Sequence, residues 1–240
     1  MVIWCIFMRW MHIPGEREES CNPKAQSLKD TALHQGKRKQ LVEVLIKKGI
    51  QNPAVLNATN RVPRHLFMDS GFMEHAYVDK AFPIAADQTI SQPYTVARQT
   101  ELLQVGAGDA VLEIGTGSGY QSAVLLEMGV TVYTIERQNE LFKKAKLFLP
   151  KLGYRPKKMI FGDGYKGLDE FAPYDGIIVT AGAPYVPKPL LAQLKVGGKL
   201  VIPVGEEVQM MQTYVRTSGT EFKKEEHGEF RFVPLLENKN

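Results

Sequence analysis

The chain has 240 residues and a mass of 26.9 kDa, which is enough for one α/β domain with a buried core. Its 44% hydrophobic and 23% charged residues are those of a soluble globular protein, and its only cysteines, Cys5 and Cys21, precede the globular pattern and exclude a disulfide framework. The net charge is only +4, and the sequence has no dense basic stripe of the kind found on nucleic-acid-binding surfaces. The five histidines show no metal-ligand spacing.

Residues 1–30 are predicted to be a poorly ordered extension, because the segment from Pro14 to Lys29 is polar and charged. The apolar run Val2–Met8 has no basic residue before it and no small-residue cleavage site after it, and it is too short to span a bilayer. We therefore expect a cytoplasmic protein with a single domain over residues 31–240.

The first half of that domain is predicted to be mainly helical. Amphipathic patterns predict helices over Lys37–Lys48, with its basic residues on a solvated face, and over Ala54–Asn60. The connection Arg61–Phe67 is expected to be a loop in which Arg64 and His65 hold the N-terminal segment in place. Residues 76–92 lack periodicity, which is typical of a functional loop, and Pro93 then begins a helix.

From residue 111 the pattern alternates between strand and helix, which predicts a doubly wound, mostly parallel sheet with helices on both faces. Two final strands separated by the turn Ser218-Gly219-Thr220 are expected to form an antiparallel edge, which gives seven strands in all. The predicted strands are Val111–Ile114, Val130–Ile135, Lys158–Phe161, Gly176–Thr180, Lys199–Val204, Met210–Arg216 and Glu229–Val233. The predicted helices are Tyr120–Met128, Gln138–Leu152 and Lys188–Leu194.

A glycine-rich turn, Gly115-Thr116-Gly117-Ser118-Gly119, joins the first of these strands to its helix. Glycines let a ligand approach the backbone and permit positive φ angles, so this turn predicts the edge of a nucleotide-type pocket. A dinucleotide fingerprint has its third glycine later, beside a phosphate-binding helix start, so an NAD-dependent oxidoreductase is disfavoured.

Two acidic strand ends share the rim of the same predicted pocket. Glu136 lies 21 residues after Gly115, where a carboxylate accepts both hydroxyls of a ribose. Asp163 follows the next strand, between Gly162 and Gly164. An acidic pocket suits a positively charged nucleoside better than a phosphorylated one, which favours S-adenosylmethionine. The simpler alternative is an ordinary turn with solvated carboxylates.

Several motifs together resemble the protein-L-isoaspartate (D-aspartate) O-methyltransferase family, a family of class I S-adenosylmethionine-dependent methyltransferases with a Rossmann-like fold. The resemblance runs from about Lys37 to Leu235, and its most specific parts are the Thr-Ile-Ser-Gln-Pro segment and the Phe-Val-Pro-Leu ending. The motifs are Val62–Phe67, Gln88–Pro93, Leu112–Gln121, Gly162–Gly164, Phe171–Asp175 and Arg231–Leu235. The resemblance implies repair of damaged polypeptides: the methyl group passes to the α-carboxylate of an L-isoaspartyl residue, and the ester then collapses to a succinimide.

The resemblance also implies roles for particular residues. Ser91 is expected to hold the substrate carboxylate as the catalytic residue, or else to cap the helix that begins at Pro93. Thr89 and Gln92 are expected to shape the same substrate loop, and Val233 is expected to pair with the substrate backbone or simply to pack in the core.

The cofactor is expected to contact Gly115, Thr116, Gly117 and Gly164, with Glu136 on its ribose and Asp163 on its adenine. Glu113 is expected to orient its amino group, or to be a buried acid that accepts turn amides. No metal ligand is assigned.

Two alternatives remain from the sequence. One is a class I methyltransferase that acts on another small molecule or macromolecule, and the other is a non-catalytic binding module on the same scaffold. The former predicts an added recognition domain or a basic stripe, and the latter predicts loss of the cofactor acids or of the Ser91 loop. We expect damaged polypeptides as partners, no nucleic acid, no membrane, and a monomer.

Overall fold

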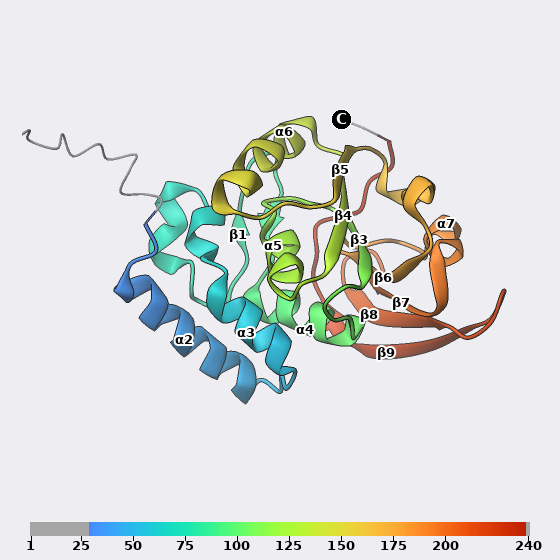
Figure 1. Ribbon diagram of the computed structural model, residues 1–240, viewed down its shortest axis with the longest axis horizontal. Helices are drawn as coiled ribbons and strands as arrows, with labels where there is room; N and C mark the ends of the chain where they lie inside the picture. The colour runs from blue at the N-terminus through green and yellow to red at the C-terminus, as the bar shows by residue number, and fades with distance from the viewer. Residues whose placement is uncertain (1–28, 239–240) are drawn as a thin grey trace, which may run out of the picture.

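The computed structural model describes residues 29–238 (Figure 1). All but the last two positions of the predicted extension, residues 1–30, therefore lie outside the described residues. Among the helices that are described, none combines the length and the apolar character that crossing a membrane requires.

Seven strands form the central sheet in the order β5-β4-β3-β6-β7-β8-β9. The first five of that order run parallel, and β8 and β9 are antiparallel, which confirms the predicted sheet and its antiparallel edge. The strands are β3 (Ala110–Ile114), β4 (Thr131–Glu136), β5 (Lys158–Phe161), β6 (Tyr174–Val179), β7 (Leu194–Val204), β8 (Gln209–Arg216) and β9 (Phe222–Phe230).

Parallel strands are apolar along their whole length because helices cover both of their faces. In β3, Val111 packs with side chains of α4 (Pro93–Leu103) and α5 (Tyr120–Glu127), whereas Leu112 packs in the cluster that contains Leu190 of α7 (Lys188–Ala192). Figure 1 shows α5 and α7 on opposite sides of the sheet. The prediction of helices on both faces is confirmed.

The strand order reverses at β3, which has β4 on one side and β6 on the other. In such a sheet the loops after the two neighbouring strands diverge and leave a crevice at their carboxyl ends. The glycine loop begins at this point, and Gly115 N–H donates to Ile135 O of β4 at 2.9 Å. The fold therefore places the loop at the switch point of the sheet.

The N-terminal helices pack beside α4 and α5 (Figure 1). Helix α2 covers Ala32–Lys47 and begins earlier than predicted, because Thr31 caps it and His34 completes a capping box in the position that glutamate usually occupies. Helix α3 covers Pro53–Arg61. The predicted loop that follows contains the 3₁₀ turns η1 (Arg64–Phe67) and η2 (Ser70–His75).

The remaining elements differ from prediction mainly at their ends. Helix α6 covers Asn139–Phe148 and continues as the 3₁₀ turn η3 (Leu149–Leu152), and the 3₁₀ turns η4 (Gly164–Lys166) and η5 (Asp169–Phe171) follow β5. The segment predicted to be irregular contains a two-stranded antiparallel hairpin of β1 (Phe82–Pro83) and β2 (Thr89–Ile90).

The last strand was predicted too late in the chain. The predicted bounds Glu229–Val233 are wrong, because β9 covers Phe222–Phe230 and shares only Glu229 and Phe230 with that range, although its antiparallel pairing with β8 is as predicted. Its sequence, from Lys223 to Glu229, is charged and does not alternate, since β9 is an edge strand with most side chains exposed. Residues 231–233 instead lead away from the sheet edge.

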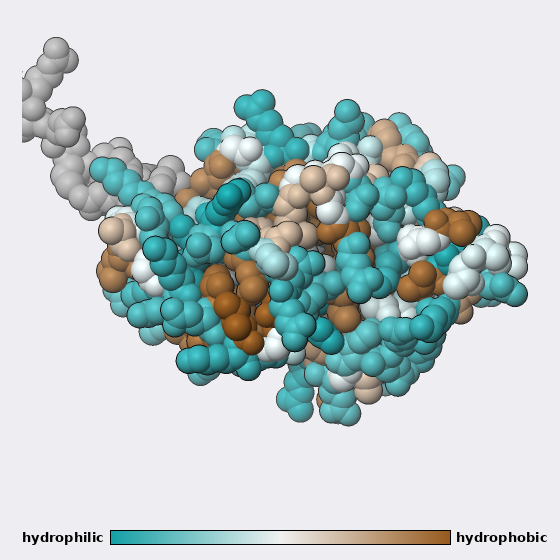
Figure 2. Space-filling model, turned by 60° about the horizontal axis from the view of Figure 1, so that its bottom comes forward, coloured by the Kyte–Doolittle hydropathy of each residue, from teal (hydrophilic) through white to brown (hydrophobic). Residues whose placement is uncertain are grey.

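The basic residues of α2 were predicted to lie on a solvated face, and Lys39, Lys47 and Lys48 are exposed. Arg38 is an exception, because it is only 5% exposed and packs against the core. Hydrophilic side chains cover most of the face seen in Figure 2, and apolar side chains show between them in several separate areas.

Candidate active site

A pocket opens at the carboxyl ends of β3, β4 and β6, and most of the predicted site residues line it. The glycine loop and the ends of β4 and β5 form one part of its wall, and the segments around residues 90 and 234 form another. The predicted residues on the wall are Thr89, Ser91, Gly115, Thr116, Gly117, Glu136, Gly164 and Val233. Glu113, Asp163 and Gln92 lie outside the set of wall residues.

Two glycines on this wall have no room for a side chain. Gly115 has a φ of +96°, and a Cβ on it would lie 2.5 Å from Thr180 Oγ1. That hydroxyl cannot move freely, because it lies 2.7 Å from Gly115 O and 2.9 Å from Ile114 O. A Cβ on Gly164 would collide with Ile114. The wall is therefore bare backbone, which a ligand can approach closely.

Glu136 ends β4 with its carboxylate turned toward the glycine loop. The side chain is buried, Oε2 accepts the N–H of Gly117 at 2.8 Å, and Oε1 accepts the N–H of Gln138 at 2.8 Å. Each carboxylate oxygen has two lone pairs, so one position remains on each oxygen. The arrangement fits a ligand that offers two adjacent hydroxyls, such as a ribose.

Glu113 is fully buried beneath the glycine loop and is not on the pocket wall. Ser122 donates to its Oε2, and its Oε1 has no partner within the described part of the chain. Burial raises the pKa of Glu113 to about 8, and the charge of Glu136 acts in the same direction, against the hydrogen bond from Ser122. Glu113 Oε1 is therefore a buried acceptor with unused hydrogen-bonding capacity, and its role toward a cofactor stays a prediction.

Asp163 is the N-cap of η4, and its Oδ1 accepts the N–H of Tyr165 at 3.0 Å. This capping bond directs the carboxylate beside Gly164, which does reach the pocket. Asp163 itself is not among the residues that line the pocket, so its place on an acidic rim with Glu136 stays a prediction.

Ser91 does not cap helix α4. The N-cap is Gln92, and the carboxylate that caps the helix comes from Asp79, whose Oδ1 accepts the N–H of Tyr94 at 2.8 Å. The capping alternative for Ser91 is therefore wrong. Its hydroxyl makes no hydrogen bond to any described residue, although Ser91 lines the pocket.

A second cavity, of about 630 Å³, adjoins the first. It lies between the start of α4 and residues 227–233, and Gln92 lines this cavity rather than the first. The two cavities share the residues Thr89, Ser91, Thr180 and Val233. Ser91 therefore stands where two ligands in the two cavities would meet.

Val233 borders both cavities, and part of its backbone is already paired. Val233 O accepts the N–H of Gly182 at 2.8 Å, and Leu235 N–H donates to Gly182 O at 2.7 Å. This pairing ties the segment after β9 to the end of β6 and holds Val233 opposite the Ser91 loop.

Two residues support this loop: Asp79, which the sequence did not indicate, and Arg64, for which the sequence predicted another role. Asp79 accepts from the side chain of Gln92 as well as from Tyr94 N–H, and Arg64 donates to Ser91 O at 2.9 Å. An acid 13 residues before Gln92 carries no local signal of a cap. Arg64 was expected to hold the N-terminal segment, but the structure directs it toward the loop.

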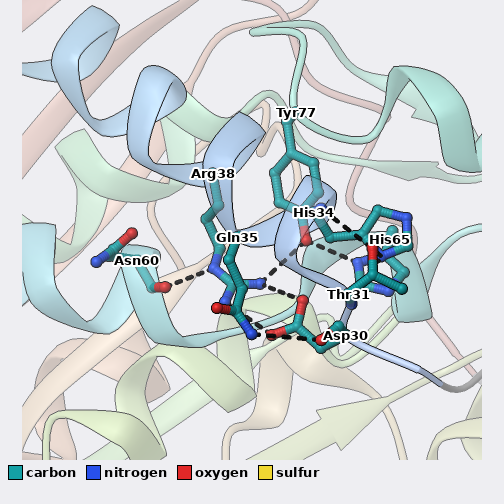
Figure 3. A network of polar contacts seen from close by, with 8 residues as sticks. All are labelled: Asp30, Thr31, His34, Gln35, Arg38, Asn60, His65 and Tyr77. Atoms are coloured by element: carbon teal, nitrogen blue, oxygen red, sulfur yellow. Dashed lines mark hydrogen bonds and ion pairs between the residues drawn. The ribbon is translucent and has the colours of Figure 1, made fainter.

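His65 does contact the N-terminal helix, since its ring stacks on that of His34 with centroids 3.8 Å apart (Figure 3). Together with Asp30 these histidines form a group whose ligand atoms lie within 4.8 Å of one another, which their sequence spacing did not indicate. Both oxygens of Asp30, however, accept from Arg38, at 3.0 and 2.9 Å. The group is thus arranged as a polar network that anchors α2, and we assign it no metal.

Comparison with known proteins decides the family. The sequence model described as Protein-L-isoaspartate(D-aspartate) O-methyltransferase matches residues 36–240. The chain belongs to this family. The match covers the motifs from Val62 to Leu235 on which the resemblance was based, so that prediction is confirmed.

Individual relatives agree with the family. The chain is 68% identical over 213 residues to the protein-L-isoaspartate O-methyltransferase of Christiangramia forsetii, covering 89% of this chain and 100% of the relative. It is 65% identical over 213 residues to that of Flavobacterium psychrophilum, with the same coverage. A solved Plasmodium falciparum structure, described as this methyltransferase in complex with S-adenosyl-L-homocysteine, superposes with a TM-score of 0.73 at 26% identity, covering 84% of this chain and 99% of that one.

Proposed function

We propose that the two adjoining cavities are the donor and acceptor sites of a protein-repair methyltransferase, and that Ser91 holds the reacting carboxylate between them. The chain is an S-adenosylmethionine-dependent protein-L-isoaspartate O-methyltransferase, as its family and relatives indicate. The observation that carries the assignment of the cavities is that Ser91 lines both, with a hydroxyl that makes no hydrogen bond to residues 29–238.

The acceptor needs no general base. An isoaspartyl α-carboxylate is already ionised at neutral pH, because the pKa of such a group lies far below 7. S-adenosylmethionine supplies an activated methyl group on a sulfonium. The protein therefore has to align carboxylate oxygen and methyl and to exclude water, and such alignment supplies up to about 7–11 kcal/mol of barrier reduction. The reaction therefore does not require a catalytic set of His, Asp or Cys side chains.

The donor cavity fits the cofactor on its own chemistry. Gly115, Thr116, Gly117 and Gly164 supply bare or nearly bare backbone. Glu136 would accept the ribose hydroxyls with the lone pairs that the amides leave free. Asp163 would accept the adenine amino group beside Gly164.

Glu113 would orient the cofactor's ammonium group from beneath the loop. Its buried Oε1 lacks a donor among the described residues, and it is the feature that favours this role over that of a structural acid.

On the acceptor side, Ser91 donates its hydroxyl to the substrate carboxylate. Thr89 and Gln92 shape the loop from either side, and Val233 faces it across the second cavity. Main-chain contacts along Val233 would suit damaged polypeptides of varied sequence, because they do not depend on the side chains of the substrate.

A methyl-transfer assay with a tritiated donor tests the function directly. We expect an isoaspartyl peptide, whose α-carboxylate is attached directly to Cα, to be methylated. Its aspartyl twin, which presents its carboxylate one methylene group further from the chain, should stay unlabelled. A D-aspartyl version decides whether that isomer is also accepted. Equal labelling of the isoaspartyl and aspartyl peptides, or none of either, would contradict the proposal.

We also propose that the enzyme works as a cytoplasmic monomer on polypeptides and binds neither nucleic acid nor membranes. The small net charge of +4 supports this view. Light scattering on the purified chain should give a mass near 26.9 kDa. A mass of twice that value, or retention on a nucleic-acid column at physiological salt, would contradict it.

A further inference from the structure

Arg64 is a buried arginine whose hydrogen bonds within the described part of the chain all go to backbone carbonyls. Its side chain is 0% exposed, and its guanidinium donates to Ala76 O at 2.9 Å, to Ser91 O at 2.9 Å and to Lys80 O at 3.2 Å. No carboxylate forms an ion pair with it anywhere in residues 29–238. Burial lowers the pKa of Arg64 to about 10, so the guanidinium keeps its charge at neutral pH.

The charge of Asp79 acts on Arg64 from beyond ion-pair distance, but burial still dominates its pKa. Burying a charge without a direct ion pair is costly, so the arginine must supply something that an apolar side chain cannot. Its rigid fork of five donors can hold several chain segments at once, which lysine cannot do. Here it joins the end of η2, the irregular segment that leads into β1, and the Ser91 loop. None of these three contacts is to the N-terminal helices.

The bond to Ser91 fixes the orientation of one peptide group. In a trans peptide the C=O and the following N–H point in opposite directions. Because Ser91 O points at Arg64, the N–H of Gln92 points away from it. Neither that N–H nor the Ser91 hydroxyl has a hydrogen-bond partner among the described residues. The loop thus presents two adjacent free donors, which is the number that the two oxygens of a carboxylate require.

The rest of the loop is held from its other side by Asp79. Its carboxylate accepts from Gln92 Nε2 at 3.0 Å and from Tyr94 N–H at 2.8 Å. Rotation of the Ser91–Gln92 peptide would break the bond between Arg64 and Ser91 O, while Asp79 holds the Gln92 side chain and Tyr94 N–H in place beside it.

Arg64 also contacts the donor side. Its guanidinium carbon lies 5.0 Å from the ring centre of Tyr120, which is the first residue of α5 and lines the donor cavity. One side chain therefore connects the acceptor loop to the helix that follows the glycine loop.

We propose that Arg64 is a positioning residue for methyl transfer: by binding the Ser91 carbonyl it turns the Gln92 N–H into a second donor, beside the Ser91 hydroxyl, for the substrate α-carboxylate. The inference rests on the proposed function of the Ser91 loop. It goes beyond that function because Arg64, which contacts neither substrate nor cofactor, sets the orientation of the loop that binds the substrate.

The test compares R64K with R216K in the full-length protein. Arg216 is a matched control, because it too donates to backbone carbonyls, those of Ala192, Leu194, Ser218 and Gly219, at the opposite end of β7 and β8. R64Q serves as a second variant if R64K does not fold, since glutamine keeps one donor in a smaller side chain.

The first readout is binding by calorimetry with S-adenosylhomocysteine present, so that no turnover occurs. We expect wild type and R216K to bind an isoaspartyl peptide more tightly than its α-carboxamide twin, and the ratio of these two affinities is the discrimination. In R64K the discrimination should fall about tenfold. The affinity of R64K for S-adenosylhomocysteine should stay within about twofold of wild type. A role confined to stability would leave the discrimination unchanged.

The second readout is kcat/KM, which should fall about 10- to 100-fold in R64K. The third is backbone hydrogen exchange, which should be faster than in wild type in residues 88–93 of R64K but unchanged there in R216K. Unchanged discrimination and exchange in R64K would overturn the proposal. A wild-type protein that ignores the isoaspartyl peptide would overturn the proposed function instead, and the exchange comparison would still decide whether Arg64 holds the loop.

Discussion

Glu136 accepts the backbone N–H of Gly117 at 2.8 Å, so the acid at the end of β4 is bound to the glycine loop that follows β3. Its second oxygen holds the start of the next helix through Gln138 N–H. The carboxylate thus fixes the shape of the loop and, with its remaining lone pairs, faces the pocket. Two separate sequence signals, the glycines and the distant acid, are one structural unit.

Replacing Glu136 with alanine should therefore weaken binding of S-adenosylmethionine by about 10- to 100-fold, because hydrogen bonds to a charged group are worth about 1.5–3 kcal/mol each. Titration calorimetry measures this directly. Glu101→Ala is the matched control, since Glu101 Oε1 also accepts two backbone N–H groups, those of Gln51 and Asn52, away from the pocket. Equal affinities in wild type and Glu136→Ala would count against the donor assignment.

Ser91→Ala should slow methyl transfer without loosening the cofactor. Removing one hydrogen bond to a carboxylate costs about 1.5–3 kcal/mol, so kcat/KM for an isoaspartyl peptide should fall about 10- to 100-fold. Affinity for S-adenosylmethionine should stay within about twofold of wild type. Ser218→Ala, in the turn before β9, is the control. Since Asp79 caps α4, the melting temperature should hardly change, and a large fall would return Ser91 to a structural role.

Glu113 makes stability depend on pH. Its pKa rises from 4.5 in the unfolded chain to about 8 in the folded protein, so between these values only the folded state retains the proton. The contribution of Glu113 to the free energy of unfolding is fully present below pH 4.5. It decreases as the pH rises toward 8, by up to about 1.4 kcal/mol per pH unit.

Glu113→Gln cannot titrate, so its stability relative to wild type should increase between pH 5 and pH 8 in the absence of cofactor. Urea unfolding at several pH values measures the difference. Glu140→Gln, at the exposed start of α6, provides the comparison. A Glu113→Gln difference that is the same at every pH would show that the buried acid does not carry the proton.

The strands and the donor side of the site were predictable because their signals are local. Continuous apolar runs mark the buried strands, and the glycines and the acid at position 136 lie at a spacing that the βαβ unit imposes. The bounds of β9 were misplaced because an edge strand needs no apolar alternation. The start of α2 was misplaced because a histidine takes the position of the usual acid in its capping box.

The supports of the acceptor loop were not predictable in the same way. Asp79 and Arg64 act on Ser91 and its neighbours through contacts that span from 13 to 27 residues of irregular chain. No periodicity links such positions. Because Arg64 binds a backbone carbonyl, no complementary side chain in the sequence indicates the contact.

The boundary of the folded domain gives the last prediction. The sequence places it after residue 30, but Asp30 binds Arg38 through both carboxylate oxygens, and Arg38 is only 5% exposed. Burial alone would raise the pKa of Asp30, but the hydrogen bond and charge of Arg38 hold it below its ordinary value. We therefore propose that residues 1–28 form a dispensable extension and that the domain begins at about Lys29.

Deleting residues 1–28 should leave the melting temperature unchanged, whereas deleting residues 1–30 should lower it by about 2–4 °C, the shift expected for ~1 kcal/mol in a domain of this size. Asp30→Asn in the full chain should give most of the second result, because it removes the charge of the Asp30–Arg38 pair but keeps the backbone of residues 29 and 30, whose Asp30 O accepts from Gln35 Nε2. Differential scanning calorimetry distinguishes the three proteins. Equal losses in both truncations would show that residues before Lys29 also stabilise the domain, since the Asp30–Arg38 pair survives in only one of them.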